Sequence, residues 1–343
     1  MSNALQLSRY PLVLWNDSAI ASDMRIAVKN GCRGGTTNPP LILKAARENA
    51  RWSRRACELS NDYDTAESSR RLADEIRVLA AKELLPVFER TGGREGFLSA
   101  QVDPHCADNI DAMVAQAVEI SHLAPNIYVK IPLTATGLTT IKQLLQRGIS
   151  VTATVSFTLS QVLAVTQVYS DVLRDWQGEH PPRLGAVLMV GRLDDYLRAL
   201  AQQRSIQLPE SIITQAGVAV AKRAYSELRY RNLPGLLVLA APRGLYHITE
   251  FLEMDAVMTA GASIRQLAYD SFDPLIPGTK PTSEALDVLR TTFPEFVQAY
   301  EPDGIHAEEF ESYGATRRTL DEFISAQEGL ERFVSECSEG SIV

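Results

Sequence analysis

Residues 127–138 read Ile-Tyr-Val-Lys-Ile-Pro-Leu-Thr-Ala-Thr-Gly-Leu, which places a lysine inside an apolar, β-branched run. Continuous apolar character is typical of a fully buried strand in a parallel sheet. An ammonium group buried without a partner costs several kcal/mol, so Lys130 is expected to lose its proton readily. A neutral amine there can form an imine with a ketone. The alternative is a lysine at a strand end that extends its amine to solvent.

Short apolar runs like this one alternate with amphipathic helical stretches along most of the chain. Strands are predicted at residues 11–15, 34–37, 97–102, 127–131, 150–156, 185–190, 236–240 and 256–259. Helical periodicity is found at residues 108–122, 137–146, 159–172, 209–230 and 246–253. Eight β-then-α units without a low-complexity linker predict an α/β fold, a (β/α)8 TIM-type barrel, in a single domain over residues 1–343.

Two segments exceed what such a barrel needs. Residues 46–89, rich in Glu, Arg and Ala, are predicted to form a helical insertion of two or three helices after the second strand. Residues 278–343 are predicted to form a helical C-terminal extension, with helices at 283–290, 307–311 and 319–337. Pro281 and Pro302 interrupt this extension.

Composition excludes several classes of partner. Hydrophobic residues make up 45% of the chain and charged residues 22%, as in an ordinary globular protein. The formal net charge of -8 argues against a nucleic acid or an anionic membrane as partner, so an anionic ligand would need a local group of arginines. Apolar runs of about 5–8 residues are too short to cross a membrane. The first residues, Met-Ser-Asn-Ala, lack the features of a signal peptide, so we expect a cytoplasmic protein.

The cysteines and histidines show no metal-site or disulfide spacing. The four cysteines are scattered along the chain and are predicted to be reduced thiols: Cys32, Cys57, Cys106 and Cys337. No HExxH, GxGxxG or GxxxxGKS motif is present. The sequence therefore predicts neither a metal nor a cofactor.

Polar residues follow the first three predicted strands, and in a (β/α)8 barrel the active site lies where strands end. Asp17 is a candidate acid/base or, alternatively, a helix N-cap. Asn38 precedes two prolines, which hold it extended, so its amide is offered to substrate hydroxyls unless the segment is simply a turn. Gln101 has apolar neighbours and needs partners, either on a neighbouring strand or through a positioned water.

The later strands contribute hydroxyls and two arginines. Thr152 and Thr154 share one face of the fifth strand, although threonine is also an ordinary strand residue. Arg192 follows the sixth strand and Arg243 the seventh. Either arginine alone is compatible with a surface charge. Two at adjacent strand ends predict a clamp for a phosphate dianion.

Taken together, these residues resemble the transaldolase family of class I, Schiff-base aldolases, over residues 11–259. The likeness is carried by four motifs in matching order: Thr-Thr-Asn-Pro at 36–39, Val-Lys-Ile-Pro at 129–132 with Thr134 and Gly-Leu at 137–138, Gly-Ile at 148–149 leading to Val-Thr-Ala-Thr at 151–154, and Val-Gly-Arg-Leu-Asp at 190–194. The resemblance implies that Lys130 forms the imine and that Asp17 is the acid/base. It also implies that Asn38 contacts the three-carbon donor unit, and that Arg192 and Arg243 hold the substrate phosphate.

Further roles are expected beside these. Thr37 and Thr152 are predicted to bind substrate, and Gln101 and Thr154 to hold the water of imine formation and hydrolysis. The expected ligands are sugar phosphates of carbohydrate metabolism, as in the pentose phosphate pathway, and the expected state is a monomer or homodimer.

Three positions depart from the usual transaldolase pattern. Gln101 replaces a glutamate and is similar to the fructose-6-phosphate aldolases, which carry an Ala-Gln-Val run there. Those aldolases have a tyrosine where this chain has Met189, and Val187 replaces a donor-contacting serine of transaldolases. The sequence thus predicts a transaldolase that transfers a dihydroxyacetone unit. The alternatives are an aldolase acting as a lyase, a specialised transaldolase with a non-standard donor or acceptor, and a non-catalytic barrel that binds sugar phosphates.

Overall fold

A computed structural model describes residues 7–270 and 275–338, in which eight parallel strands pair in sequence order and close into a barrel. The strands are β1 (Val13–Asp17), β2 (Gly35–Thr36), β3 (Leu98–Gln101), β4 (Ile127–Pro132), β5 (Val151–Thr154), β6 (Leu184–Leu188), β7 (Leu236–Ala240) and β8 (Val257–Ala260). Helices connect the successive strands. The predicted (β/α)8 barrel is therefore confirmed.

Burial explains why the strands were recognisable. Every residue of β3, β4, β5 and β6 is buried, and β4 and β6 are almost continuously apolar. The predicted ends were less accurate. β1 is shifted by two residues from the predicted range of 11–15: it begins at Val13 and ends at Asp17. β6 ends at Leu188, so Met189 lies outside the strand on which it was placed.

The chain divides into two compact units, which are described separately. The lysine unit, named for Lys130, comprises residues 15–130 and 319–343. The arginine unit, named for Arg192 and Arg243, comprises residues 1–14 and 131–318. That residues 1–343 form a single domain stays a prediction.

In the lysine unit, helices occupy the predicted insertion and the segments between strands. They are α2 (Ala21–Lys29), α3 (Pro39–Arg47), α4 (Ala50–Ser60), α5 (Thr65–Arg90), the 3-10 turn η1 (Pro104–Cys106) and α6 (Ile110–Ser121). Asparagine and aspartate side chains begin the insertion: the carboxylate of Asp64 accepts the backbone N–H of Glu67 at 2.8 Å and starts α5. The insertion thus contains two complete helices, and α3 enters it from the preceding segment.

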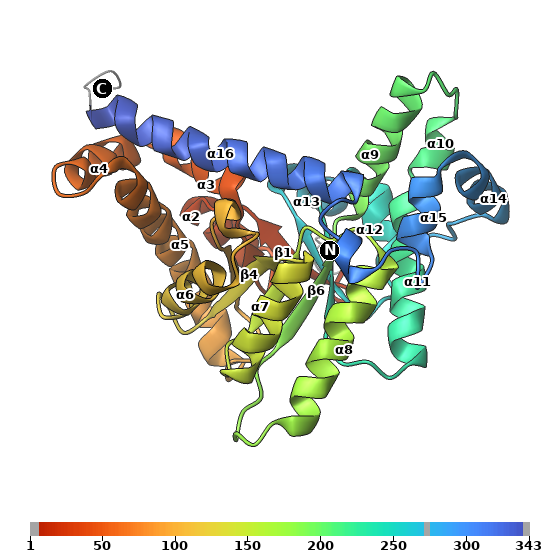
Figure 1. Cartoon of the computed structure of the whole chain (residues 1–343), viewed down its shortest axis with the longest axis horizontal. Coiled ribbons are helices and arrows are strands. Elements are labelled where there is room, and N and C mark those ends of the chain that lie inside the picture. Colours follow the sequence, from red (N-terminus) through yellow and green to blue (C-terminus); the bar gives the residue numbers. More distant parts are fainter. Residues whose placement is uncertain (1–6, 271–274, 339–343) are drawn as a thin grey trace. The chain divides into compact units, whose positions relative to one another are not determined.

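The C-terminal part of α16 (Gly314–Ser338) packs on this insertion, passing α3 and α4 (Figure 1). Phe333 and Val334 of α16 share one buried cluster with Trp52 of α4 and Ile76 of α5. Burial of large apolar side chains contributes about 1.5–3 kcal/mol each. The last described part of the extension, residues 319–338, therefore packs into the core of the lysine unit.

The arginine unit contains the remaining helices. They are α7 (Ala135–Gln146), α8 (Leu159–Asp175), α9 (Val190–Gln203), α10 (Glu210–Ile213), α11 (Ala216–Tyr230), α12 (Leu245–Phe251), α13 (Ala262–Asp270), α14 (Ser283–Thr292), α15 (Pro294–Tyr300) and the 3-10 turn η2 (Ala307–Glu309). Helices α14 and α15 lie beside α11 (Figure 1). The helix predicted at 307–311 is thus only a 3-10 turn.

The single helix predicted at residues 209–230 is wrong, because the chain forms α10 and α11 with a break between them. The buried carboxylate of Asp194 accepts the backbone N–H of Gly217 at 2.8 Å and so marks the start of α11. A Cβ atom on Gly217 would lie 2.3 Å from the carbonyl oxygen of Val190. The close approach of α9 and α11 therefore requires glycine at residue 217, just after the break between α10 and α11.

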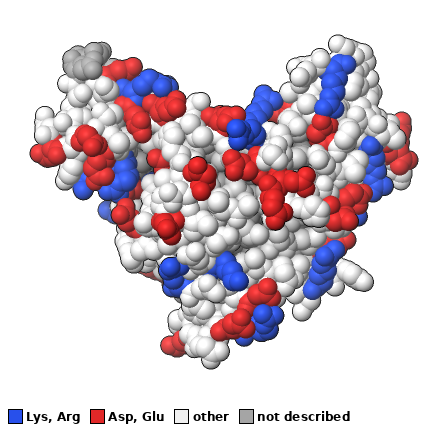
Figure 2. Space-filling view, viewed as in Figure 1, with Lys and Arg blue, Asp and Glu red and all other residues white. Residues whose placement is uncertain are grey.

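Charges are mixed on the molecular surface, with acidic and basic side chains interspersed on the face shown in Figure 2. Among the described helices, none combines the length and the apolar character needed to cross a membrane.

Candidate active site

Lys130 lies in β4 with only 5% of its surface exposed. Its Nζ donates hydrogen bonds to the hydroxyl of Thr36, at 3.0 Å, and to the carbonyl oxygen of Thr37, at 3.2 Å. Both of these acceptors are uncharged groups at the end of β2. The alternative that Lys130 extends its amine to solvent is wrong, because the amine is buried. The role of Thr36 as a partner of the amine was not predicted, although its motif was singled out.

Thr37 and Asn38 already hold local structure. The hydroxyl of Thr37 donates to the carbonyl of Ser99 on β3 at 3.1 Å, and the side-chain oxygen of Asn38 accepts the backbone N–H of Leu41 at 3.0 Å. Asn38 is thereby the N-cap of α3, and the prolines after it occupy the first helical positions, where no N–H is required. The amide NH2 of Asn38 keeps its capacity to donate to a ligand.

Gln101 is the last residue of β3 and is opposite Lys130 in the pairing of β3 with β4. Its side chain is 1% exposed, and within the described residues neither its amide oxygen nor its amide nitrogen has a hydrogen-bond partner. Of the two partners expected for this amide, a neighbouring strand is thus not observed. A buried amide without protein partners is a place for an ordered water or a ligand.

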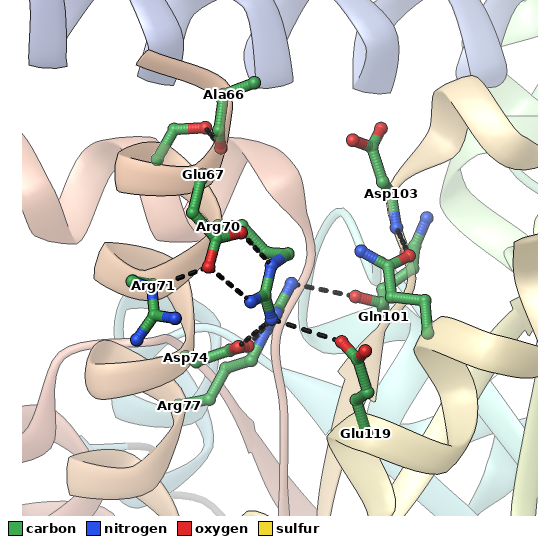
Figure 3. Close-up of polar contacts among 11 residues, drawn as sticks. Ala66, Glu67, Arg70, Arg71, Asp74, Arg77, Gln101, Asp103 and Glu119 are labelled. Carbon is green, nitrogen blue, oxygen red and sulfur yellow. Dashed lines mark hydrogen bonds and ion pairs between the residues drawn. The ribbon is translucent and has the colours of Figure 1, made fainter. Parts of the chain in front are cut away.

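The main chain of Gln101 is held from outside the barrel by Arg77 of α5 (Figure 3). The guanidinium of Arg77 donates to the carbonyl oxygen of Gln101 at 2.8 Å and forms an ion pair with Asp74 at 2.6 Å. Arg77 was missed from the sequence. Its signal is an arginine at a helical position whose neighbours on the same face are Ala73 and Ala80, both buried.

A second set of contacts extends this support. Figure 3 shows Arg70 of the same helix between Glu67, Asp74 and Glu119 of α6. On the other side of Gln101, the backbone N–H of Asp103 donates to the side chain of Gln116 at 2.7 Å. The helices α5 and α6 together fix the segment in which β3 ends.

Asp17 is half-buried at the end of β1, where it pairs with Thr36 in the sheet. The alternative role for Asp17 as an N-cap is wrong. The residue in the N-cap position of α2 is Ile20, which makes no side-chain capping bond, and the nearby hydroxyl of Ser18 accepts the N–H of Ile20. The structure leaves the acid/base role of Asp17 as a prediction.

In the arginine unit, Thr152 and Thr154 are both buried in β5, as predicted for a shared inward face. Within the described residues, the hydroxyl of Thr154 is buried without a hydrogen-bond partner. The buried hydroxyl of Thr154 can hold a water or a ligand. Val187 in β6 and Met189 at the N-cap of α9, two of the positions that differ from the usual transaldolase pattern, are also buried.

The two predicted arginines come from segments that touch. Arg192 is half-buried in the first turn of α9, and Arg243 lies in the loop between β7 and α12. A Cβ atom on Gly191 would lie 2.1 Å from the carbonyl oxygen of Ala241 and 2.7 Å from Cγ of Arg243. Only glycine allows this approach, so the structure brings these two segments together, as the clamp hypothesis requires.

The guanidinium of Arg243 already has partners within the protein. Its Nε donates to the carboxylate of Asp195 at 2.8 Å, and its Nη2 forms an ion pair with the same carboxylate at 2.6 Å. Its Nη1 donates to the carbonyl oxygen of Ala241 at 3.0 Å. Burial raises the pKa of Asp195, but the hydrogen bonds and charges of Arg243 and Arg198 outweigh it and leave the pKa below its usual value. The sequence did not indicate this ion pair.

A buried polar group supports the loop that carries Arg243. The backbone N–H of Arg243 donates to Nδ1 of His247 at 3.0 Å, so the ring proton of a neutral imidazole is on Nε2. That nitrogen lies 3.4 Å from the carboxylate of Asp194, which also accepts the hydroxyl of Tyr246 at 3.0 Å. Burial, and then the neighbouring Asp194, raise the pKa of Tyr246. His247 and Asp194 are both fully buried.

Comparison with known proteins shows the family to which the chain belongs. The model of the family described as transaldolase/fructose-6-phosphate aldolase matches residues 14–312. A transaldolase of Thiobacillus denitrificans is 30% identical over 255 residues, which are 70% of this chain and 68% of that protein. Transaldolase 1 of Streptomyces avermitilis is 30% identical over 199 residues, 56% of this chain and 53% of that protein. Transaldolase 2 of Streptomyces coelicolor is 34% identical over 139 residues, 40% of this chain and 37% of that protein. In the two Streptomyces comparisons the chain thus spans about half, or less, of the relative's length.

Proposed function

Because this chain belongs to the transaldolase/fructose-6-phosphate aldolase family, we propose that it transfers a dihydroxyacetone unit from a ketose phosphate to an aldose phosphate. The observation that carries this proposal is the buried amine of Lys130 in a barrel strand. Burial disfavours the ammonium form, and a neutral amine is the form that attacks a ketone.

The first step in this proposal is imine formation. Nζ of Lys130 attacks the C2 ketone of the donor, and loss of water leaves an iminium cation. The acceptors on Thr36 and Thr37 aim the amine before the substrate arrives. Orienting a nucleophile in advance removes part of the entropic cost of the reaction.

The second step breaks the bond between C3 and C4. Asp17 takes the proton from the C4 hydroxyl, the aldehyde leaves, and the electron pair of the broken bond moves into the iminium to give an enamine on Lys130. A well-placed acid or base contributes roughly 10²–10⁴-fold to such a step. The enamine then adds to the acceptor aldehyde, whose oxygen takes the proton, and water releases the product from the lysine.

Gln101 and Thr154 handle water in this scheme. The unpartnered amide of one and the unpartnered hydroxyl of the other are suited to hold the water that leaves and re-enters during imine chemistry. An amide orients a water but does not take its proton. We therefore expect slower imine turnover than with a glutamate at this position.

The remaining residues bind the substrate. Arg192 and Arg243 hold the phosphate through guanidinium donors, and Asn38, Thr37 and Thr152 face the hydroxyls of the donor unit. Bidentate binding of a phosphate dianion favours arginine over lysine.

A lyase activity is the second candidate, and Gln101 is the observation that favours it. If the enamine is protonated at carbon before an acceptor arrives, water hydrolyses the resulting iminium, dihydroxyacetone leaves Lys130, and the enzyme acts as an aldolase. Gln101 lies in an Ala-Gln-Val run similar to the one that fructose-6-phosphate aldolases carry at this position.

Borohydride reduction with fructose 6-phosphate tests the lysine chemistry, because only an imine is trapped covalently. We expect a stable adduct on Lys130, and none in Lys130→Met. Product analysis with and without erythrose 4-phosphate then separates transfer from cleavage. Binding of the sugar phosphate with no adduct and no product would leave a non-catalytic binding barrel as the function.

A further inference from the structure

The guanidinium of Arg243 is already occupied by a carboxylate in the protein without substrate. Its Nε and Nη2 form the edge that binds a carboxylate or a phosphate in bidentate fashion. Nε donates to Oδ2 of Asp195, and Nη2 forms an ion pair with the same oxygen. The opposite edge is in use as well, since Nη1 donates to the carbonyl oxygen of Ala241. A phosphate cannot take the favourable edge of Arg243 while Asp195 remains there.

The backbone around Arg243 has little freedom to give a phosphate another approach. Ala241 has a φ of 58°, a left-handed conformation that is strained for alanine. Its carbonyl lies where any side chain at residue 191 would have to be, and His247 accepts the backbone N–H of Arg243. The part that can move is therefore the side-chain pair of Arg243 and Asp195, each about one third exposed.

Asp195 has a second cationic partner, Arg198, which can compensate its charge when Arg243 binds another anion. Its other oxygen, Oδ1, accepts Nη1 of Arg198 at 2.7 Å. Arg198 also pairs with Glu210, so the charges form a chain from Arg243 through Asp195 and Arg198 to Glu210. A carboxylate that loses Arg243 is thus still compensated by Arg198.

We propose that Asp195 is the built-in counter-ion of the phosphate clamp: it neutralises Arg243 in the free protein and is displaced by the phosphate of the substrate. This inference rests on the proposed function, which assigns phosphate to Arg243. Asp195 is then a specificity-determining residue. A substrate with a phosphate dianion replaces the carboxylate on Arg243, whereas an unphosphorylated substrate leaves the ion pair intact and gains nothing from the arginine.

Displacement makes phosphate binding weaker than an open clamp would give, so removing the charge of Asp195 should strengthen it. In Asp195→Asn we expect Kd for inorganic phosphate, measured by calorimetry, to fall by about fivefold, the size of a partly exposed ion pair. The ratio of KM for fructose 6-phosphate to KM for fructose should fall by a similar factor. A role that is merely structural would raise both KM values together.

Glu210→Gln is the matched control. It removes one negative charge from the same chain of ion pairs, but Glu210 contacts Arg198 and makes no contact with Arg243 that the structure records. We expect its Kd for phosphate to stay within about twofold of the wild-type value, the size of a weak surface pair. An equal gain in both variants would attribute the effect to net charge and overturn displacement.

The opposite result in Asp195→Asn is also decisive. Weaker phosphate binding would mean that Asp195 holds Arg243 in its binding pose and is not displaced. Arg243→Ala distinguishes this failure from that of the proposed function: if it leaves the preference for phosphorylated substrates unchanged, then the clamp itself is wrong.

One measurement needs no variant. A crystal structure of the wild-type protein with inorganic phosphate should show phosphate oxygens on Nε and Nη2 of Arg243, with Asp195 moved beyond hydrogen-bond distance and still paired with Arg198. Phosphate bound with the Arg243–Asp195 contact unchanged would overturn the inference.

Discussion

Lys130 and Arg243 are both basic side chains in or just after a barrel strand, yet the protein surrounds them differently. Lys130 is almost fully buried, and two of its partners are a hydroxyl and a backbone carbonyl. Arg243 is about one third exposed and is paired with a carboxylate. Burial makes the charged form of an amine costly, whereas a partly exposed guanidinium is suited to binding an anion. These differences agree with the proposed roles of a nucleophile and an anion-binding group.

The support behind the two groups differs in the same way. In the lysine unit, a buried guanidinium of α5 holds the carbonyl of Gln101, the residue opposite Lys130. In the arginine unit, Nδ1 of His247 accepts the backbone N–H of Arg243. Each support comes from a helix outside the barrel rather than from the strand itself. The helices therefore decide how accurately the strand ends are placed.

The largest expected effect comes from removing the amine of Lys130, the proposed nucleophile. Lys130→Met keeps a similar side-chain volume, so we expect the fold to persist and the carbon–carbon chemistry to fall by about 10⁴-fold or more. The measurements are the transfer rate, the borohydride adduct and the melting temperature. Retained activity, with borohydride labelling at another lysine, would refute the proposed role of Lys130 as the nucleophile.

Removing the support of the lysine unit should have the next largest effect. In Arg77→Met the carboxylate of Asp74 loses its buried partner and the carbonyl of Gln101 loses its donor, so we expect a loss of about 3 kcal/mol in the free energy of unfolding. Denaturant unfolding measures it. Arg71→Met is the matched control, because Arg71 lies on the same helix but is more exposed and pairs with Glu67. Equal losses in both variants would show that burial of the Arg77 contacts is unimportant.

Removing the cation of the arginine unit should affect one class of substrate. Hydrogen bonds to charged groups contribute about 1.5–3 kcal/mol, so Arg243→Ala should raise KM for fructose 6-phosphate by about tenfold to a hundredfold. KM for fructose or dihydroxyacetone should change far less. Arg192→Ala should behave in the same way if both arginines bind the phosphate. Equal losses on phosphorylated and unphosphorylated substrates would instead assign a structural role to the arginines.

A smaller effect is expected at Gln101. Replacing it with glutamate would place a carboxylate near Lys130, as Asp195 is placed near Arg243. In Gln101→Glu we expect imine turnover to rise by about tenfold, below the 10²–10⁴-fold of a fully positioned acid–base group, with a new ionisation in the pH–rate profile. The balance of products should shift toward transfer. Lower activity together with a lower melting temperature would refute the water-positioning role, because it would mean that the amide donates a structural hydrogen bond.

The smallest effect is the pH dependence of the ion pair of Asp195. A carboxyl whose pKa is lower in the folded than in the unfolded state stabilises the protein above the unfolded pKa, near 3.9, and loses this effect as the pH falls toward the folded value. Because the pair is partly exposed, we expect less than about 1 kcal/mol. The stability advantage of the wild type over Asp195→Asn should therefore shrink when unfolding is measured below about pH 4. An advantage that grows on acidification would contradict the direction of the pKa shift.

Much of the fold was predictable because its signals are local. Burial made strands such as β4 and β6 into short apolar runs, and the helical periodicity between them indicated helices such as α6 and α7. The break between α10 and α11 was not predictable. The helical pattern is continuous there, and the break is fixed by the close approach of Gly217 to Val190 and by a hydrogen bond from Gly217 to Asp194.

The sequence by itself determined the types of groups at the strand ends. It specified a lysine in a buried strand, a glutamine at the end of β3 and an arginine after β7. The tertiary structure alone decided their partners. Arg77 meets Gln101 across 24 residues, and Arg243 meets Asp195 across 48. Such contacts depend on how helices pack on the barrel, and side-chain periodicity within a segment carries no information on which distant residue will be opposite. The sequence therefore indicated the types of reactive and charged groups, whereas the hydrogen bonds and ion pairs around them were known only from the tertiary structure.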